Sequence, residues 1–283
     1  MFSRNGWRRF KFGLQTILGL SKRGFFIPYR YAASVSDSQP VYAALEQVFN
    51  AKRAGFAEFC KSLDVYAGEF ENFDAAPRPK WQQGWFSRLD GAAAYGLVRQ
   101  REPKTIIEVG SGHSTRFMAQ AIYDGGLDCT QIAIDPYPRA AIQSLPIEWR
   151  AELLNEEHIA MFADLEAGDI AFFDSSHILM PGTDVDMIFN RIMPVLKPGV
   201  LIHIHDILLP DPYPEAWLWR GYNEQNALGP MIASNAYEVI FASAYVASRM
   251  QNEIAATSLS QLPLFEGAYE TSLWLEKNKS CSL

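Results

Sequence analysis

The chain has 283 residues, a mass of 31.9 kDa and a formal charge of −7, and 48% of its residues are hydrophobic. This length and apolar content exclude a disordered protein and allow one large α/β domain with appendages. The net acidity argues against a nucleic-acid binder, which usually presents a basic face. The charge is uneven, because residues 1–35 carry seven Lys or Arg and no acid, whereas the remainder carries 18 basic and 32 acidic side chains.

The first 35 residues are predicted to form a basic N-terminal segment. Apolar residues from Trp7 to Ile17 recur at helical spacing among basic ones, which predicts a short amphipathic helix. The apolar run 12–20 is shorter than the roughly 20 residues that a membrane-spanning helix requires, and 21–23 is basic where a signal-peptide cleavage site would stand. Three interpretations stay open: a helix docked on the body of the protein, a peripheral contact of residues 1–23 with the anionic inner membrane surface, or a transit peptide.

The cysteines indicate the compartment. Cys60, Cys129 and Cys281 are odd in number and far apart in the sequence. Their spacing predicts neither a disulfide framework nor a thiolate zinc site, and it favours a reducing, cytoplasmic location.

Residues 36–100 are expected to form a helical lead-in to the main domain. An apolar stripe predicts one helix over 41–63. Pro77 and Pro79 then interrupt the chain, and a stretch rich in alanine and aromatic residues predicts a second helix over 81–98.

Residues 101–279 are predicted to form the catalytic domain, in which short strands alternate with helices. Strands are predicted at 105–109, 131–134, 151–154, 169–173, 200–205, 237–241 and 272–275. Helices are predicted at 113–123, 184–195 and 216–233. This alternation is typical of a Rossmann-like, doubly wound α/β fold whose mostly parallel sheet is covered on both faces.

The sharpest motif is a glycine turn between the first strand and the next helix, with the sequence Glu108-Val-Gly110-Ser111-Gly112-His-Ser114-Thr115. Glycines at such a turn let the backbone approach a ligand, and the helix N-terminus offers free N–H groups. Thr115 stands where a dinucleotide fingerprint has its third glycine, and Glu108 would repel a pyrophosphate. The carboxylate instead suits a cofactor with positive charge and no phosphate.

An acid ends the second predicted strand. Asp135 follows the apolar stretch 131–134 and stands 23 residues after Gly112. A carboxylate at this point of an α/β fold accepts hydrogen bonds from ribose hydroxyls, and the spacing matches one mononucleotide-binding unit.

Two further polar clusters end the fourth and fifth strands: Asp174-Ser-Ser-His177 and His203-Ile-His205-Asp206. Ligands of open parallel sheets bind outside the carboxyl ends of the strands, so both clusters are expected to face the same crevice as the glycine turn. His203 lies within its strand and is expected to be a hydrogen-bonded core residue. The catalytic candidates are therefore His205, Asp174, Asp206 and His177. Their chemistry fits either a divalent metal or a general base with an orienting partner.

These motifs together resemble the class I S-adenosylmethionine-dependent methyltransferases, and within them a bacterial branch with a G-S-G-H-S-T turn, a D-S-S-H segment and an H-I-H-D strand end. The similarity covers roughly residues 80–277 and includes Leu196-Lys-Pro-Gly199. It implies a seven-stranded sheet with the last strand antiparallel and S-adenosylmethionine contacts at the glycine turn and Asp135. The chain departs from the family at Ser114, where a third glycine is common, and after 151–154, where the adenine-binding acid is missing.

The resemblance implies methyl transfer, and the His and Asp residues at the strand ends favour O-methylation of a small or sugar-like molecule. We expect His205 to be the general base and Asp174 or Asp206 to orient it or hold a metal. His177 is the second candidate for the general base. Aromatic residues flanking the crevice are candidates for an acceptor pocket: Trp81, Trp85, Phe86, Tyr213, Trp217 and Trp219. Two alternatives remain, a nicotinamide-dependent oxidoreductase and a non-catalytic scaffold. The acceptor, the metal dependence and the oligomeric state are not predicted.

Overall fold

The computed structural model describes residues 4–36, 38–74 and 76–278, and within them seven strands form one sheet in the order β3-β2-β1-β4-β5-β7-β6. The strands are β1 (Thr105–Val109), β2 (Thr130–Ile134), β3 (Glu148–Arg150), β4 (Ile170–Phe173), β5 (Leu201–Ile204), β6 (Tyr237–Ala242) and β7 (Leu273–Lys277). From β3 to β5 all neighbours pair in parallel. Only β7 runs against both of its neighbours, β5 and β6. The predicted sheet with an antiparallel last strand is confirmed.

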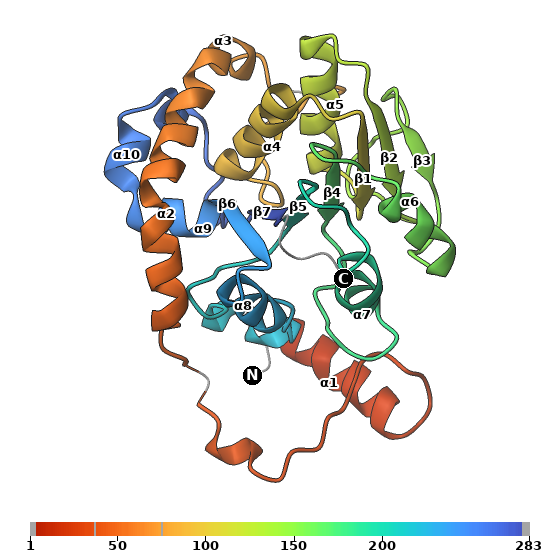
Figure 1. Ribbon diagram of the computed structural model, residues 1–283. Coiled ribbons are helices and arrows are strands. Elements are labelled where there is room, and N and C mark those ends of the chain that lie inside the picture. The colour runs from red at the N-terminus through yellow and green to blue at the C-terminus, as the bar shows by residue number, and fades with distance from the viewer. Residues whose placement is uncertain (1–3, 37, 75, 279–283) are drawn as a thin grey trace.

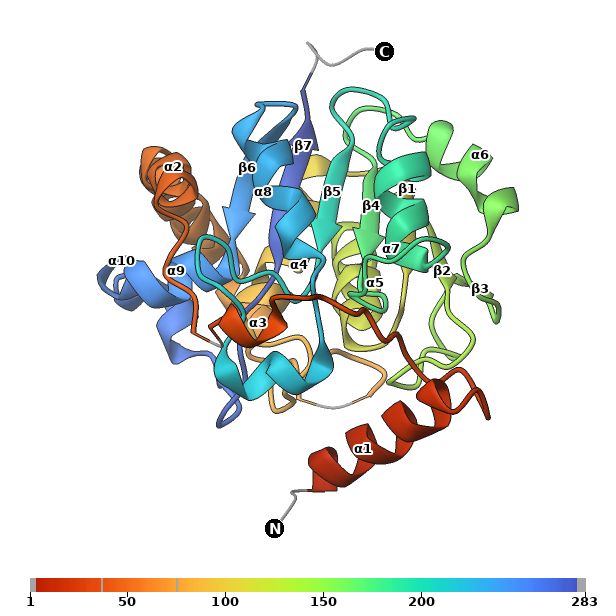
Figure 2. The ribbon, with the colours of Figure 1, turned by 90° about the horizontal axis from the view of Figure 1, so that it is seen from below.

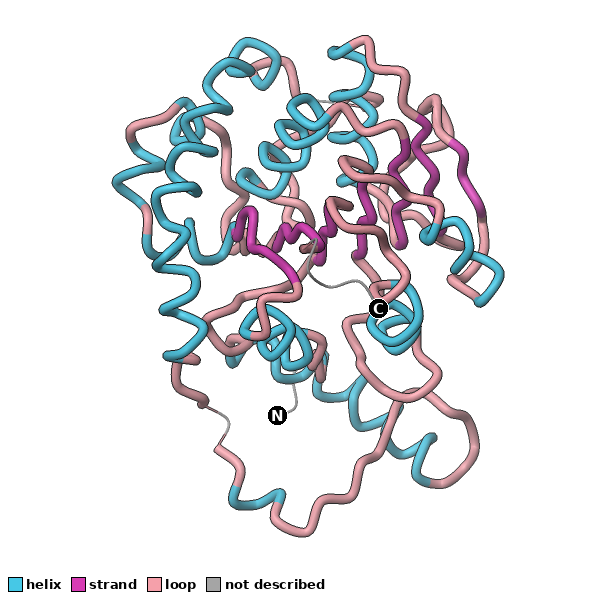
Figure 3. The backbone as a smooth tube through the Cα atoms, viewed as in Figure 1, coloured by secondary structure: helices cyan, strands magenta, loops and turns pink. Residues whose placement is uncertain are grey.

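Helices cover both faces of this sheet. They are α1 (Arg4–Ile17), α2 (Ala43–Ser62), α3 (Ala67–Phe70), α4 (Arg88–Arg101), α5 (His113–Gly125), α6 (Ile159–Ala163), α7 (Asp184–Met187), α8 (Gln225–Ala233), α9 (Ser243–Arg249) and α10 (Gln251–Ala255). Figures 1 and 3 show α4 and α5 on one side of the strands and α7 and α8 on the other. The doubly wound architecture predicted from the strand–helix alternation is therefore present.

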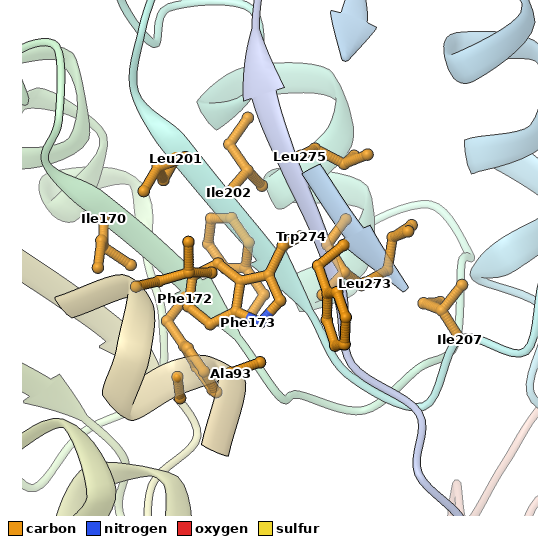
Figure 4. Packing of buried hydrophobic residues seen from close by; sticks show 14 of the residues in the cluster. Ala93, Ile170, Phe172, Phe173, Leu201, Ile202, Ile207, Leu273, Trp274 and Leu275 are labelled. Carbon is orange, nitrogen blue, oxygen red and sulfur yellow. The ribbon is translucent and has the colours of Figure 1, made fainter. Parts of the chain in front are cut away.

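The core lies along the central strands. Phe172, Phe173, Ile202 and Trp274 are at most 1% exposed and are labelled in Figure 4. The strand register places Phe172 and Trp274 on one face of the sheet, with ring centroids 6.0 Å apart, and the other two on the opposite face. Strands that are covered on both faces must be apolar on both faces, which explains the continuous hydrophobic runs in β4 and β5. This rigid centre fixes the positions of the loops that follow β1, β4 and β5.

Three predicted elements differ from the structure. The helix expected over 81–98 begins only at Arg88, because the side-chain oxygen of Gln83 accepts hydrogen bonds at 2.8 Å from the backbone N–H groups of Trp85 and Phe86 and holds a turn there. The third strand is Glu148–Arg150 rather than 151–154. The helix expected over 216–233 is split into a 3₁₀ turn over 215–220 and α8, since Gly221 (φ +72°) ends the first part. Helices α9 and α10 had no predicted counterpart.

The N-terminal helix α1 stands at the margin of the molecule. Figure 2 shows it on the side toward which β4 and β5 point, and it lies next to the 3₁₀ turn Glu215–Arg220. Among the described residues, no helix has the length and apolar character to cross a membrane. Cys60 and Cys129 are free thiols, and Cys281 lies outside the described residues.

Candidate active site

The glycine turn follows β1 at the carboxyl edge of the sheet, where the ends of β1 and β4 touch. The backbone N–H of Asp174 donates to the carbonyl of Val109 at 2.9 Å. Gly110 has φ +78°, and a Cβ atom at this position would lie 1.8 Å from the carbonyl oxygen of Asp174. Only glycine fits both the backbone conformation and the space, so Gly110 allows the two strand ends to approach.

Glu108 is buried beneath this turn instead of lining a pocket. Its two carboxyl oxygens accept hydrogen bonds from the hydroxyls of Ser114 and Thr115, the latter at 2.6 Å. Thr115 also accepts the backbone N–H of Gly112 at 2.8 Å. Burial raises the pKa of Glu108 to about 8. Ser114 and Thr115, the two residues that depart from glycine-rich fingerprints, thus connect the turn to the buried carboxyl group.

Asp135 ties the end of β2 to the same turn. One carboxylate oxygen accepts the backbone N–H of Ser111 at 2.7 Å and its hydroxyl at 3.1 Å, and the other accepts the backbone N–H of Tyr137 at 2.7 Å. The Asp135 side chain belongs to a half-buried residue, and a carboxylate has about four acceptor positions, so it keeps capacity for further donors. The structure thus brings together the predicted cofactor-binding residues, with Glu108 beneath the surface.

A second cluster lies at the ends of β4 and β5. The Nε2 atom of His177 lies 3.3 Å from a carboxylate oxygen of Asp174 and 3.5 Å from one of Asp206, and its Nδ1 lies 2.9 Å from Glu224. His177 (φ +60°) and Asp206 (φ +55°) both have the left-handed backbone conformation that non-glycine residues rarely adopt. Such strain costs about 1–2 kcal/mol per residue and is often found at functional sites.

The three carboxylates make His177 a buried cation. Although burial alone would lower it, the pKa of His177 is raised well above its ordinary value by Asp174, Glu224 and Asp206. Burial alone would raise the pKa of Asp174, but His205 and His177 keep the pKa of that carboxyl below its usual range. A His177 imidazolium beside an ionised Asp174 is therefore the stable arrangement.

His205 has one free ring nitrogen. Its Nε2 lies 2.8 Å from the carbonyl oxygen of Trp85, which can only accept, so Nε2 carries the proton. The Nδ1 atom is buried and has no hydrogen-bond partner in the part of the chain that the structure describes. Burial lowers the pKa of His205, but Asp174 and Asp206 outweigh it and raise the pKa above the ordinary value. His203, in contrast, stacks on Phe172 in the core.

Three of the four catalytic candidates line one pocket, whose walls are Gly84, Trp85, Arg139, Asp174, His205, Asp206, Trp217, Arg220, Gly267, Tyr269 and Thr271. His177 lies behind the two aspartates. Of the six aromatic residues predicted for an acceptor pocket, Trp85 and Trp217 line it. Trp81 and Phe86 are buried core residues at 4% and 2% exposure, whereas Tyr213 and Trp219 do not contribute to the walls.

Sequence reasoning missed the two arginines and Tyr269 of this pocket. The backbone N–H of Arg139 donates to the carbonyl of Ser111 at 3.1 Å. Arg139 stands only four residues after Asp135, and this short spacing from an acid at a strand end could have predicted its place in the site. Arg220 lies 4.3 Å above the ring of Trp217 and 3.6 Å from Asp206. Tyr269 precedes β7 in a loop that carries no recognisable motif.

The donor set does not fit a divalent metal. Asp174 and Asp206 are the natural oxygen ligands, but the Nε2 atom of His177 lies within 3.5 Å of both. Within the described residues, no three His, Cys, Asp or Glu side chains are grouped in a way that could hold a metal ion. The His177 ring instead lies beside both carboxyl groups, where a bound cation would have to lie.

Comparison with known proteins shows a similarity to methyltransferases. A family model described as a methyltransferase domain matches residues 107–207. No curated protein sequence matches the chain significantly. Among solved structures, the O-methyltransferase from Bacillus cereus in complex with SAH matches with a TM-score of 0.43 and 13% identity over 88% of this chain and 96% of that chain. The SAH-bound methyltransferase PaMTH1 from Podospora anserina matches with a TM-score of 0.41 and 13% identity over 90% and 100% of the two chains.

Structural likeness at these scores assigns neither substrate nor chemistry. The family model spans the segment from β1 to the end of the H-I-H-D motif, which includes the glycine turn, Asp135 and both polar clusters. Residues 107–207 are therefore similar to a methyltransferase domain, and they lie in a sheet with the order β3-β2-β1-β4-β5-β7-β6.

Proposed function

We propose that this protein transfers a methyl group from S-adenosylmethionine to a hydroxyl group of a small or sugar-like acceptor. One observation carries the proposal: the pocket lined by Asp174, His205 and Asp206 adjoins the glycine turn. Arg139 makes the connection, because its backbone bonds Ser111 of the turn and the residue also lines the pocket. A cofactor on the turn would therefore reach the pocket that holds the His and Asp side chains.

The residues of the turn fit this cofactor. Asp135 offers carboxylate oxygens to the two ribose hydroxyls, and the N-terminus of α5 offers backbone N–H groups. The carboxyl groups of Asp174 and Asp206 in the pocket wall make the pocket suitable for a cationic sulfonium. The same carboxylates would repel a pyrophosphate, which disfavours a dinucleotide.

His205 is the proposed general base. When bound, S-adenosylmethionine supplies an electrophilic methyl group whose bond to sulfur breaks, with the electron pair going to sulfur, as the acceptor oxygen attacks. The Nδ1 atom of His205 takes the hydroxyl proton, because Nε2 is held by the carbonyl of Trp85. Asp174 and Asp206 stabilise the resulting imidazolium, which is the effect that raises the pKa of His205.

His177 acts as a positioning residue. Glu224 holds its Nδ1, and its Nε2 faces both Asp174 and Asp206. A buried cation at this place lowers the pKa of Asp174 and holds the two side chains near each other at the pocket wall. The strained backbone of His177 and Asp206 is consistent with a site where geometry takes priority over local stability.

The pocket walls favour a polar acceptor with an apolar face. Trp85, Trp217 and Tyr269 offer rings, whereas Arg139 and Arg220 offer hydrogen-bond donors. Sugars and phenols present both kinds of surface, because their hydroxyls lie around a ring with apolar faces.

A direct test is an assay for S-adenosylhomocysteine formation with a panel of monosaccharides, aryl glycosides and phenols, each paired with its amino analogue. We expect product with at least one hydroxyl compound and none with its amino partner. Transfer to amines alone would contradict the hydroxyl assignment. Thermal stabilisation by a nicotinamide dinucleotide, with none by S-adenosylhomocysteine, would contradict the cofactor and favour an oxidoreductase.

A further inference from the structure

The N-terminal surface, which we define as residues 4–35, presents large apolar side chains to solvent. The residues concerned are between 45% and 74% exposed: Trp7, Phe10, Leu14, Ile17, Leu18, Leu20, Phe25, Phe26, Ile27, Tyr29, Tyr31 and Val35. Single exposed apolar residues are normal, but a contiguous group of this size marks a binding surface. Docking of α1 on the body, one of the interpretations from sequence, does not cover these side chains.

In α1 four apolar side chains share one face, and Phe12 lies apart from them. Trp7, Phe10, Leu14 and Ile17 follow each other at three- and four-residue steps, and Trp7 and Phe10 pack edge to face with ring centroids 6.0 Å apart. The helix has 14 residues, so it is about 21 Å long, shorter than the roughly 30 Å of a bilayer's hydrocarbon core. Its geometry therefore fits a helix that lies along an interface.

Basic side chains border this apolar surface, and residues 4–35 contain no acid. Arg8 and Arg23 lie 5.3 and 5.9 Å from the centroid of the Phe12 ring, and Lys22 lies 5.0 Å from that of Phe25. Aromatic rings interleaved with Lys and Arg are typical of the headgroup region of a membrane, where the rings enter the apolar boundary and the cations meet lipid phosphates.

We propose that the N-terminal surface docks on an anionic lipid bilayer. The body of the protein is acidic and would be repelled by such a bilayer, so the basic N-terminal surface must supply the attraction. Figure 2 shows α1 on the side toward which β4 and β5 point, which is also the side of the candidate active site. This inference concerns binding alone and does not depend on the methyl-transfer reaction.

The test is co-sedimentation of the full chain with two kinds of vesicle, one of phosphatidylcholine alone and one with 30% phosphatidylglycerol. We expect at least tenfold more binding to the anionic vesicles, and loss of that preference in 500 mM NaCl, because salt screens exposed charges. In the variant Leu14→Ser/Ile17→Ser we expect at least a tenfold loss of binding.

The control is Val65→Ser/Leu153→Ser, which alters more exposed apolar side chains (72% and 74%, against 45% and 63% for Leu14 and Ile17) elsewhere on the surface. It should bind within twofold of the unaltered protein, and circular dichroism should show that both variants are folded. Equal binding of both variants, or no binding to anionic vesicles, overturns the proposal. Concentration-dependent dimers that the Leu14→Ser/Ile17→Ser variant abolishes, without vesicle binding, would instead identify a second copy of the chain as the partner.

Discussion

The candidate active site has two halves that are built differently. In the cofactor half, formed by residues 108–115 and Asp135, both carboxylates accept hydrogen bonds from the glycine turn itself. In the acceptor half, formed by residues 174–177 and 203–206, His177 and Asp206 have strained backbones, and the Nδ1 atom of His205 has no partner among the described residues.

This difference indicates a division of work. Hydrogen bonds within the cofactor half hold its backbone in place before any ligand binds. Its residues therefore act mainly by fixing the shape of the cofactor site. The acceptor half keeps a buried proton acceptor, the Nδ1 atom of His205, near the ionised Asp174, which is an arrangement that suits proton transfer. Substitutions in the first half should therefore change folding and binding, and those in the second should change rate.

The largest effect is expected for Gly110→Ala. The new methyl group would collide with the carbonyl oxygen of Asp174 at 1.8 Å, in a backbone conformation that alanine disfavours. We expect the free energy of unfolding to fall by about 4 kcal/mol, measured by urea denaturation. The control Gly126→Ala has a similar φ of +58° but no atom within 4 Å, and it should cost only about 1 kcal/mol. Equal losses in the two variants would show that β1 and β4 do not approach here.

His205→Gln should be the largest effect on rate. Glutamine retains a donor for the carbonyl of Trp85 but cannot take a proton, so methyl transfer should fall by about 10²–10⁴-fold, as measured by S-adenosylhomocysteine formation. Affinity for S-adenosylhomocysteine should stay within twofold. His158→Gln alters another buried histidine, outside the pocket, and should leave the rate unchanged. If both variants transfer methyl groups at the same rate, His205 is not the base.

The two halves were not equally accessible to prediction from sequence. The end of each parallel strand meets the same edge of the sheet, so Asp135, Asp174 and His205 were placed near one another by strand patterns alone. The burial of Glu108 was missed, because no pattern shows that the hydroxyls of Ser114 and Thr115 turn inward to it.

The errors concern features that depend on packing between distant segments. The three-residue edge strand β3 has too few residues for a clear period. Trp81 belongs to the core because it packs with Phe117, its ring centroid 4.9 Å away, and this contact joins residues 36 positions apart. Arg220 and Tyr269 reach the pocket from loops whose paths are set by the tertiary structure.

The pH dependence of the reaction rate should reflect the protonation of His205 in the acceptor half. Only the neutral form of His205 accepts a proton, and Asp174 and Asp206 raise the pKa of His205 above its ordinary 6.5. The rate should therefore rise with pH through a midpoint above 6.5. In Asp174→Asn one of the raising charges is removed, so the midpoint should move to lower pH. A midpoint that stays in place would mean that another group controls the rate.

The pH dependence of the free energy of unfolding should reflect the protonation of Glu108 in the cofactor half. Burial raises the pKa of Glu108 from 4.5 to about 8, so its contribution to stability is fully present below pH 4.5 and is lost as pH rises toward 8. Between pH 6 and pH 8 we expect the unaltered protein to lose about 2 kcal/mol more stability than Glu108→Gln, by urea denaturation. Parallel curves for the two proteins would contradict a buried, protonated Glu108.

The central claim is that the glycine turn and Asp135 bind S-adenosylmethionine, and isothermal titration with S-adenosylhomocysteine tests it most directly. We predict binding to the unaltered protein and to Asp128→Ala, an exposed carboxylate at the opposite end of β2, and at least about tenfold weaker binding to Asp135→Ala. The same affinity in all three proteins, or none in any of them, would contradict the account.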